Sequence, residues 1–92
     1  MSAAARHRLE VEFCAVCKFH GRAFWLLREL VDQRADLADE YVLIPSSGGA
    51  FTVRYDGAVV FDYKEQGRFP EPKEVREAVL AASGRPATPR RH

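Results

Sequence analysis

Two cysteines stand where the hydrophobic pattern of this chain changes its period. Before Cys14, apolar and charged residues alternate from Arg8 to Phe13, the period of a strand with one buried face. After Cys17, apolar residues recur at helical spacing, namely Phe19, Ala23, Leu26, Leu27, Leu30 and Val31. The pattern predicts a strand, a Cys-x-x-Cys turn and a helix that ends near Ala38, and this order restricts the fold more than any other feature.

The segment after this helix predicts a second strand. Tyr41–Ile44 is a short apolar run followed by Pro45, which is typical of a strand that is buried on both faces and ends at the proline. A strand, a helix and another strand form a right-handed parallel crossover. We therefore expect the first two strands to be parallel neighbours.

A hairpin follows, in which Asp56-Gly57 joins the strands Ala50–Tyr55 and Ala58–Tyr63. This dipeptide favours the positive φ values of a two-residue type I′ turn. The register predicted from the turn pairs Val53 with Val60 and Tyr55 with Ala58 on the core side, and Arg54 with Val59 and Thr52 with Phe61 on the other side.

A last helix is predicted to begin near Pro70–Pro72 and to end at Gly84. The expected order is β-α-β-β-β-α, an α/β (α+β) arrangement. Ninety-two residues suit one domain. We assign this domain to residues 8–83, with a flexible N-terminus over 1–7 and a disordered basic tail over 84–92.

Charge and cysteine content argue against several classes of protein. Fourteen basic and thirteen acidic residues give a net charge of +1, so no overall field favours nucleic acid or an anionic membrane. The apolar runs are too short to span a membrane, and the first residues lack the apolar stretch of a secretion signal. We expect a cytoplasmic protein, either a monomer or a weak dimer, that binds neither nucleic acid nor membranes.

The Cys-x-x-Cys spacing carries the chemistry that the sequence favours. One thiol can attack a disulfide and the other can resolve the mixed disulfide, without a metal or an organic cofactor. At a strand-to-helix corner, Cys14 is expected nearest the surface as the attacking thiol, with Cys17 resolving from the first helical turn. Two alternatives are that both cysteines are ordinary buried side chains, or that they bind zinc with His7 or His20, for which a second Cys-x-x-Cys is absent.

Four stretches together carry a family resemblance: Val11–Cys17, Arg22-Ala23, Ile44–Phe51 and Gly67–Pro70. In these stretches, and in their order, the chain resembles the selenoprotein W (Rdx) family in its cysteine-containing, bacterial type. The resemblance implies a thioredoxin-like fold that lacks one middle helix, with a four-stranded mixed sheet and both helices on one face. It also implies a role in cellular redox homeostasis.

The resemblance bears on the attacking thiol and on substrate binding. Selenium-containing members have selenocysteine where this chain has Cys17, which favours Cys17 as the attacking group, so the assignment stays open between the two thiols. Thioredoxins place a cis-proline beside the disulfide, whereas the matching stretch here contains Ser47, Gly48 and Gly49. Glycine backbone can approach the thiols or an extended substrate closely, so we expect this loop to bind substrate.

The leading hypothesis is a thiol–disulfide redox protein that acts on protein disulfides or glutathione through Cys14 and Cys17. The alternative is a protein-binding module that uses the open face of the sheet, with the thiols as a redox sensor. Arg54 and Phe61 are the residues expected to contact the partner on that face.

Overall fold

The computed structural model describes residues 6–84, so the remainder of the predicted N-terminus and basic tail lies outside the described residues. The elements are β1 (Arg8–Cys14), α1 (His20–Arg34), the 3₁₀ turn η1 (Ala35–Leu37), β2 (Glu40–Ser46), β3 (Phe51–Tyr55), β4 (Ala58–Asp62), α2 (Tyr63–Gln66) and α3 (Pro72–Ser83). The predicted order is confirmed, and η1 and the one-turn α2 are additions to it.

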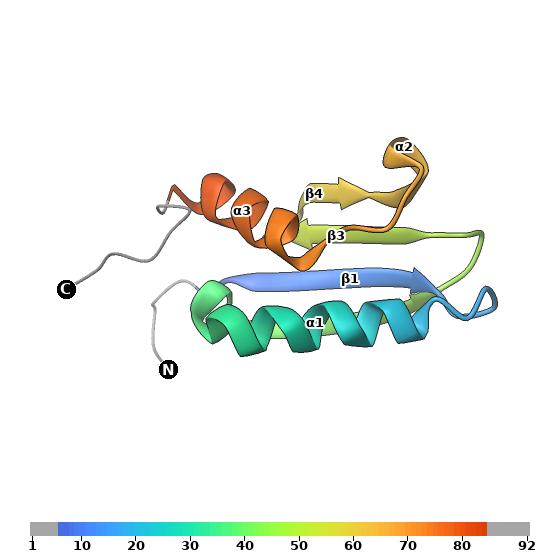
Figure 1. Cartoon of the computed structure of the whole chain (residues 1–92), viewed down its shortest axis with the longest axis horizontal. Coiled ribbons are helices and arrows are strands. Elements are labelled where there is room, and N and C mark those ends of the chain that lie inside the picture. The colour runs from blue at the N-terminus through green and yellow to red at the C-terminus, as the bar shows by residue number, and fades with distance from the viewer. Residues whose placement is uncertain (1–5, 85–92) are drawn as a thin grey trace.

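The four strands form one mixed sheet in the order β2-β1-β3-β4. β1 is parallel to β2 and antiparallel to β3, and β3 is antiparallel to β4. The predicted parallel crossover through α1 is therefore confirmed. Both long helices, α1 and α3, cover the same face of the sheet (Figure 1), and their apolar side chains belong to one core cluster.

The core lies between that face and the two helices. Its members alternate along the strands and follow the inner stripes of the helices, and include Leu9, Val11, Phe13, Ala23, Leu26, Leu30, Val53, Val75 and Val79. Val31, which the helical pattern placed in the stripe, is 40% exposed. The buried stripe of α1 thus ends one residue earlier than predicted.

β2 differs from its prediction in position and in length. It is an edge strand whose residues are only half-buried, and it continues through Pro45 to Ser46. An edge strand tolerates proline because one side of its backbone has no neighbouring strand to receive an N–H. The prediction of a strand buried on both faces and ended by Pro45 is therefore wrong.

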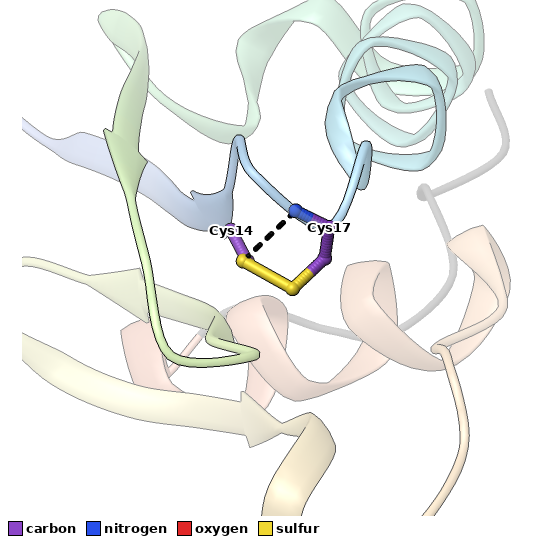
Figure 2. Close-up of a disulfide and its surroundings, with 2 residues drawn as sticks. All are labelled: Cys14 and Cys17. Atoms are coloured by element: carbon purple, nitrogen blue, oxygen red, sulfur yellow. Dashed lines mark hydrogen bonds between the residues drawn. A yellow bond between two sulfur atoms is a disulfide. The ribbon is translucent and has the colours of Figure 1, made fainter.

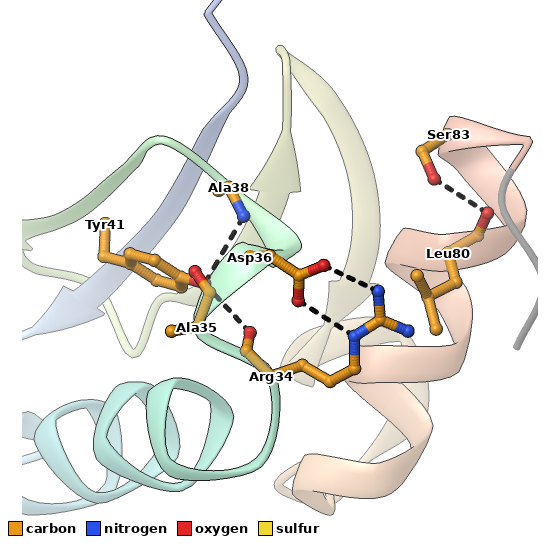
Figure 3. A network of polar contacts seen from close by, with 7 residues as sticks. All are labelled: Arg34, Ala35, Asp36, Ala38, Tyr41, Leu80 and Ser83. Atoms are coloured by element: carbon orange, nitrogen blue, oxygen red, sulfur yellow. Dashed lines mark hydrogen bonds and ion pairs between the residues drawn. The ribbon is translucent and has the colours of Figure 1, made fainter. Parts of the chain in front are cut away.

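The end of α1 is fixed by a polar network rather than by the apolar pattern (Figure 3). The Tyr41 hydroxyl donates to the Ala35 carbonyl at 2.8 Å and accepts the Ala38 N–H at 3.3 Å. Arg34 donates two hydrogen bonds to the Asp36 carboxylate, at 2.9 and 2.8 Å. These contacts stabilise a 3₁₀ turn after Arg34, so the α-helix ends four residues before the predicted Ala38.

The predicted two-residue hairpin turn is confirmed. Asp56 and Gly57 have φ values of 51° and 86°, both positive as a type I′ turn requires. The Asp56 carboxylate lies 2.7 Å from His7 Nδ1 and accepts the Arg8 backbone N–H at 2.8 Å. These two hydrogen bonds, His7 first, lower the pKa of Asp56. His7 thus takes part in the hydrogen bonds of the described fold.

Beyond this turn the hairpin register is only partly as predicted. An irregularity between Val53 and Arg54 shifts the pairing, so that Val53 lies opposite Phe61 instead of Val60. Two residues on one strand then span one on the other, which is the property of a β-bulge. Because a one-residue shift turns a side chain to the other face, Phe61 is 6% exposed in the core. The predicted exposure of Phe61 on the open face is wrong.

The last helix begins where the prolines predicted. Pro72 occupies the first turn, and Glu71 and Glu74 form a reciprocal capping box. Arg68 donates to Glu74 at 2.6 and 2.8 Å, and this contact is the main reason that the pKa of Glu74 falls to about 2. Gly84, with a φ of 78°, ends the helix.

Candidate functional site

The two cysteines form a disulfide at one end of the sheet (Figure 2). Cys14 is the last residue of β1, and Cys17 lies in the turn that follows. Their Cα atoms are 5.3 Å apart, within the range of protein disulfides. The chain thus holds both thiols at bonding distance within its first strand-to-helix connection.

The two sulfur-bearing residues differ sharply in exposure. Cys14 is 0% exposed, whereas Cys17 is exposed. Cys14 ends a central strand, and the chain on both sides covers it: its N–H donates to the Ala50 carbonyl at 2.7 Å, and the Ala15 N–H donates to Ser46 at 2.9 Å. The geometric expectation that Cys14 lies nearest the surface is therefore wrong, and Cys17 is the more accessible of the two residues.

One backbone hydrogen bond distinguishes the sulfur of Cys14. The Cys17 N–H donates to Cys14 Sγ at 3.1 Å (Figure 2). Such a donor stabilises negative charge on the acceptor sulfur. Cys14 is thus suited to be the thiolate that is released when an incoming thiol attacks the disulfide at Cys17.

The turn between the cysteines and α1 is separate from the helix. α1 begins at His20, so Cys17 does not lie in its first turn as predicted. Lys18 has a φ of 61°, the left-handed region, and this reversal interrupts the helical path directly after Cys17. The Lys18 N–H returns to the Ala15 carbonyl at 3.0 Å and closes the turn.

The predicted substrate loop does lie beside the disulfide. Ser47, Gly48 and Gly49 connect β2 to β3, and the next residue, Ala50, accepts the Cys14 N–H. Figure 2 shows this connection passing next to the two cysteines. Gly48 and Gly49 have φ values of 74° and 76°, which an L side chain rarely adopts. The glycines are thus required by the backbone path, and the structure brings the loop and the thiols together.

A cluster of aromatic rings packs around Phe69, close to the start of α1. Phe69 contacts Phe19 and Phe51, with ring centroids 5.0 and 5.2 Å apart, and Tyr63 at 4.6 Å. Phe69 thus packs against the core. Tyr63, predicted as the last residue of a strand, is instead the first residue of α2 and packs in this cluster. The sequence contained no clear signal for that one-turn helix.

Comparison with known proteins shows the family to which this chain belongs. A family model described as the Rdx family matches residues 8–81. The chain belongs to the Rdx family. The resemblance to selenoprotein W and the thioredoxin-like α+β fold that it implied are both confirmed.

Three relatives of this Rdx-family chain show how far the similarity extends. A Bordetella parapertussis protein of known structure has 31% identity and a TM-score of 0.79, covering 85% of this chain and 99% of its own. A selenoprotein W-related protein from Vibrio cholerae has 27% identity and a TM-score of 0.78, covering 85% and 98%. Migration and invasion enhancer 1 of Bos taurus is 34% identical over 76 residues, 83% of this chain but 64% of that protein, so the match spans less than two thirds of it.

The two residues proposed for a partner surface on this Rdx-family sheet do not lie together. Phe61 faces the core, and Arg54 on the open face donates to Glu12 at 2.7 Å and lies 3.7 Å from Glu10. The hydrogen bond from Arg54, followed by that from the Ser46 hydroxyl, lowers the pKa of Glu12. The Arg54 guanidinium is thus held on the open face by glutamates of β1. Arg54 and Phe61 lie on opposite faces of the sheet, so a partner bound to the open face could not contact both of them.

The described residues offer neither a metal cluster nor a membrane-spanning helix. Within residues 6–84, no group of three His, Cys, Asp or Glu side chains is arranged to hold a metal ion. His7, one candidate zinc ligand, pairs instead with Asp56 at the far end of β1. No helix in the described part of the chain is long and apolar enough to cross a membrane.

Proposed function

We propose that this chain is a thiol–disulfide oxidoreductase in which Cys17 attacks and Cys14 resolves, acting on protein disulfides or glutathione. The observation that carries the proposal is the contrast in exposure, because Cys14 is fully buried and Cys17 is exposed. A nucleophile must reach the substrate sulfur, whereas a resolving thiol needs to reach only its neighbour. Membership of the Rdx family and the disulfide-forming pair support the redox role.

The reaction transfers two electrons from the cysteine pair to the substrate. The Cys17 thiolate attacks one sulfur of the substrate disulfide, forms a mixed disulfide and releases the first substrate thiolate. The Cys14 thiolate then attacks Cys17 Sγ, forms the intramolecular disulfide and releases the second substrate thiolate. The two protons that the cysteines give up protonate the two substrate thiolates, so the reaction balances without a cofactor.

Return to the dithiol state follows the same path in reverse. A reducing thiolate attacks the accessible Cys17 Sγ and expels Cys14 as a thiolate. The Cys17 N–H, 3.1 Å from Cys14 Sγ, stabilises the charge that develops on that leaving sulfur. A second reducing thiolate then attacks the reductant sulfur of the mixed disulfide, which releases Cys17 as a thiolate and leaves the reductant as a disulfide. We place this cycle in the cytoplasm, where glutathione and thioredoxin keep thiols reduced.

Single-cysteine variants test the assignment. The Cys14→Ser protein retains the exposed thiol and should accumulate a mixed disulfide with oxidised glutathione, detected by intact mass. The Cys17→Ser protein, with only the buried thiol, should form it at least about tenfold more slowly, because access limits the rate. Equal rates, or a faster reaction of Cys17→Ser, would refute the assignment of Cys17 as the attacking thiol.

A redox titration tests the redox proposal as a whole. Wild-type protein equilibrated in glutathione buffers and then alkylated should show one two-electron transition between about −300 and −150 mV. Absence of an intramolecular disulfide at every potential would contradict the oxidoreductase. Protection of both thiols by stoichiometric zinc would contradict it as well.

A further inference from the structure

An open cleft begins at the residue that follows Cys17, the proposed attacking thiol. It has a volume of ≈ 470 Å³ and is lined by Lys18, Gly21, Arg22 and Trp25. Lys18 directly follows Cys17 in the chain, so the cleft begins next to the reactive turn. Trp25 is 42% exposed, and Val16, between the two cysteines, is 81% exposed. A chain segment bound through its disulfide to Cys17 would therefore meet both apolar surface and the side chains of the cleft.

The cations of this cleft lack the carboxylate partners that several other cations of the fold have. Arg54 and Arg68 each pair with a glutamate. By contrast, neither Lys18 nor Arg22 forms an ion pair with any residue between 6 and 84. The sequence itself has no acidic residue from Phe13 to Arg28. The cleft is thus lined by two cations without an ion-pair partner in the described part of the chain, although the whole chain carries a net charge of only +1.

Arg22 is also held in a defined orientation. Its guanidinium carbon lies 4.5 Å from the centre of the Phe69 ring. A guanidinium stacked on an aromatic ring keeps its N–H edges free, and these edges match the two oxygens of a carboxylate. At the loop between β2 and β3, Lys64 Cε lies 3.9 Å from the position that a Cβ on Gly49 would occupy. The substrate loop is therefore also bordered by a cation.

We infer that the cleft selects protein substrates in which an acidic residue lies within a few positions of the disulfide cysteine. Arg22 and Lys18 bind that carboxylate, and Trp25 packs against the stem of the same side chain. This inference rests on the proposed function, since it concerns the substrate that Cys17 attacks. Charge complementarity acts here mainly on the rate of encounter and on the choice between substrates.

The test uses three short peptides that differ at one position. Each has a single cysteine, joined as a mixed disulfide to 2-mercaptoethanol, and carries Glu, Gln or Lys two positions away. The second-order rate of reduction by the reduced wild-type protein is measured by acid quench and mass. At low ionic strength we expect the Glu peptide to react about three- to tenfold faster than the Gln peptide, and the Lys peptide more slowly still.

Matched variants locate the effect in the cleft. Lys18→Gln and Arg22→Gln should each reduce the preference for the Glu peptide, and Arg22→Glu should reverse it toward the Lys peptide. Arg28→Gln removes the same charge farther along α1, where Arg28 lies 3.8 Å from Asp32, and should leave the preference unchanged. The rate with the uncharged Gln peptide reports whether each variant keeps its basal activity.

Each outcome bears on a different claim. Equal rates with the Glu and Gln peptides in the wild-type protein would overturn the inference and leave the oxidoreductase standing. Loss of preference in Arg28→Gln as large as in Arg22→Gln would also overturn it, because the effect would then come from the overall charge. If no peptide is reduced, the proposed function itself fails.

Discussion

Replacement of Phe61 by alanine tests the β-bulge of the hairpin, which decides the face of the sheet on which Phe61 lies. In a regular hairpin Phe61 would lie on the open face opposite Thr52. In the structure the bulge brings it opposite Val53 and into the core, where it is 6% exposed. The cost of removing its ring therefore differs greatly between the two registers.

The expected cost follows from this burial. Truncation of a buried phenylalanine to alanine typically destabilises a protein by about 3 to 5 kcal/mol. Val59 on the same strand is 56% exposed, so Val59→Ala should cost no more than about 0.5 kcal/mol. With an m-value of roughly 1.5 kcal/mol per M, Phe61→Ala should lower the urea midpoint by roughly 2 to 3 M.

The assay is urea unfolding of the oxidised protein, followed by circular dichroism. Should Phe61→Ala fail to fold, Phe61→Leu serves in its place and should still cost about 1 kcal/mol more than Val59→Ala. A midpoint of Phe61→Ala equal to that of Val59→Ala would refute the bulge. It would also restore Phe61 to the open face as a candidate partner residue.

Three further predictions concern charge and backbone. Arg68 lowers the pKa of Glu74 from its ordinary value of 4.5 to about 2. The pair therefore stabilises the fold fully above pH 4.5, and this stabilisation is lost as the pH falls toward 2. Glu74→Gln should remove about 1 kcal/mol of this pH dependence, since the partly exposed pair is screened by solvent, and equal pH profiles from urea unfolding would contradict it. Gly48→Ala meets no atom within 4 Å but must adopt a φ of +74°, so it should cost about 1 kcal/mol in thermal unfolding; an unchanged melting temperature would show that the strain is absent. Arg54→Gln should raise the pKa of Glu12 toward its ordinary value in an NMR titration, and no shift would disprove their pairing.

Element order was predictable because each element has its own local signal. The alternation before Cys14, the helical stripe after Cys17 and the Asp56-Gly57 turn all depend on residues close together in sequence. The turn also fixed the first two strand pairs, of which Tyr55 with Ala58 is one. Local patterns of this kind need no knowledge of how the layers pack.

The register beyond the turn was not predictable by the same means. Val59, Val60 and Phe61 are all apolar, so the period of two that reveals a buried face is absent from the middle of β4. Only the packing of Phe61 against the core selects the bulged register over the regular one. Pro45, by contrast, was an available signal, because proline inside a strand favours the edge of a sheet.

The roles of the two thiols depend on a part of the structure that no local pattern describes. Cys14 is buried because β1 is central, so that the last residue of β2, Ser46, lies beside it on one side and Ala50, just before β3, accepts its N–H on the other. Cys17 is exposed because the turn leaves the sheet and Lys18 reverses the chain before α1 starts. The same reversal sets Lys18 at the wall of the cleft. One backbone conformation therefore both exposes Cys17, the proposed nucleophile, and places Lys18 in the cleft, which links the proposed nucleophile to the proposed choice of substrate.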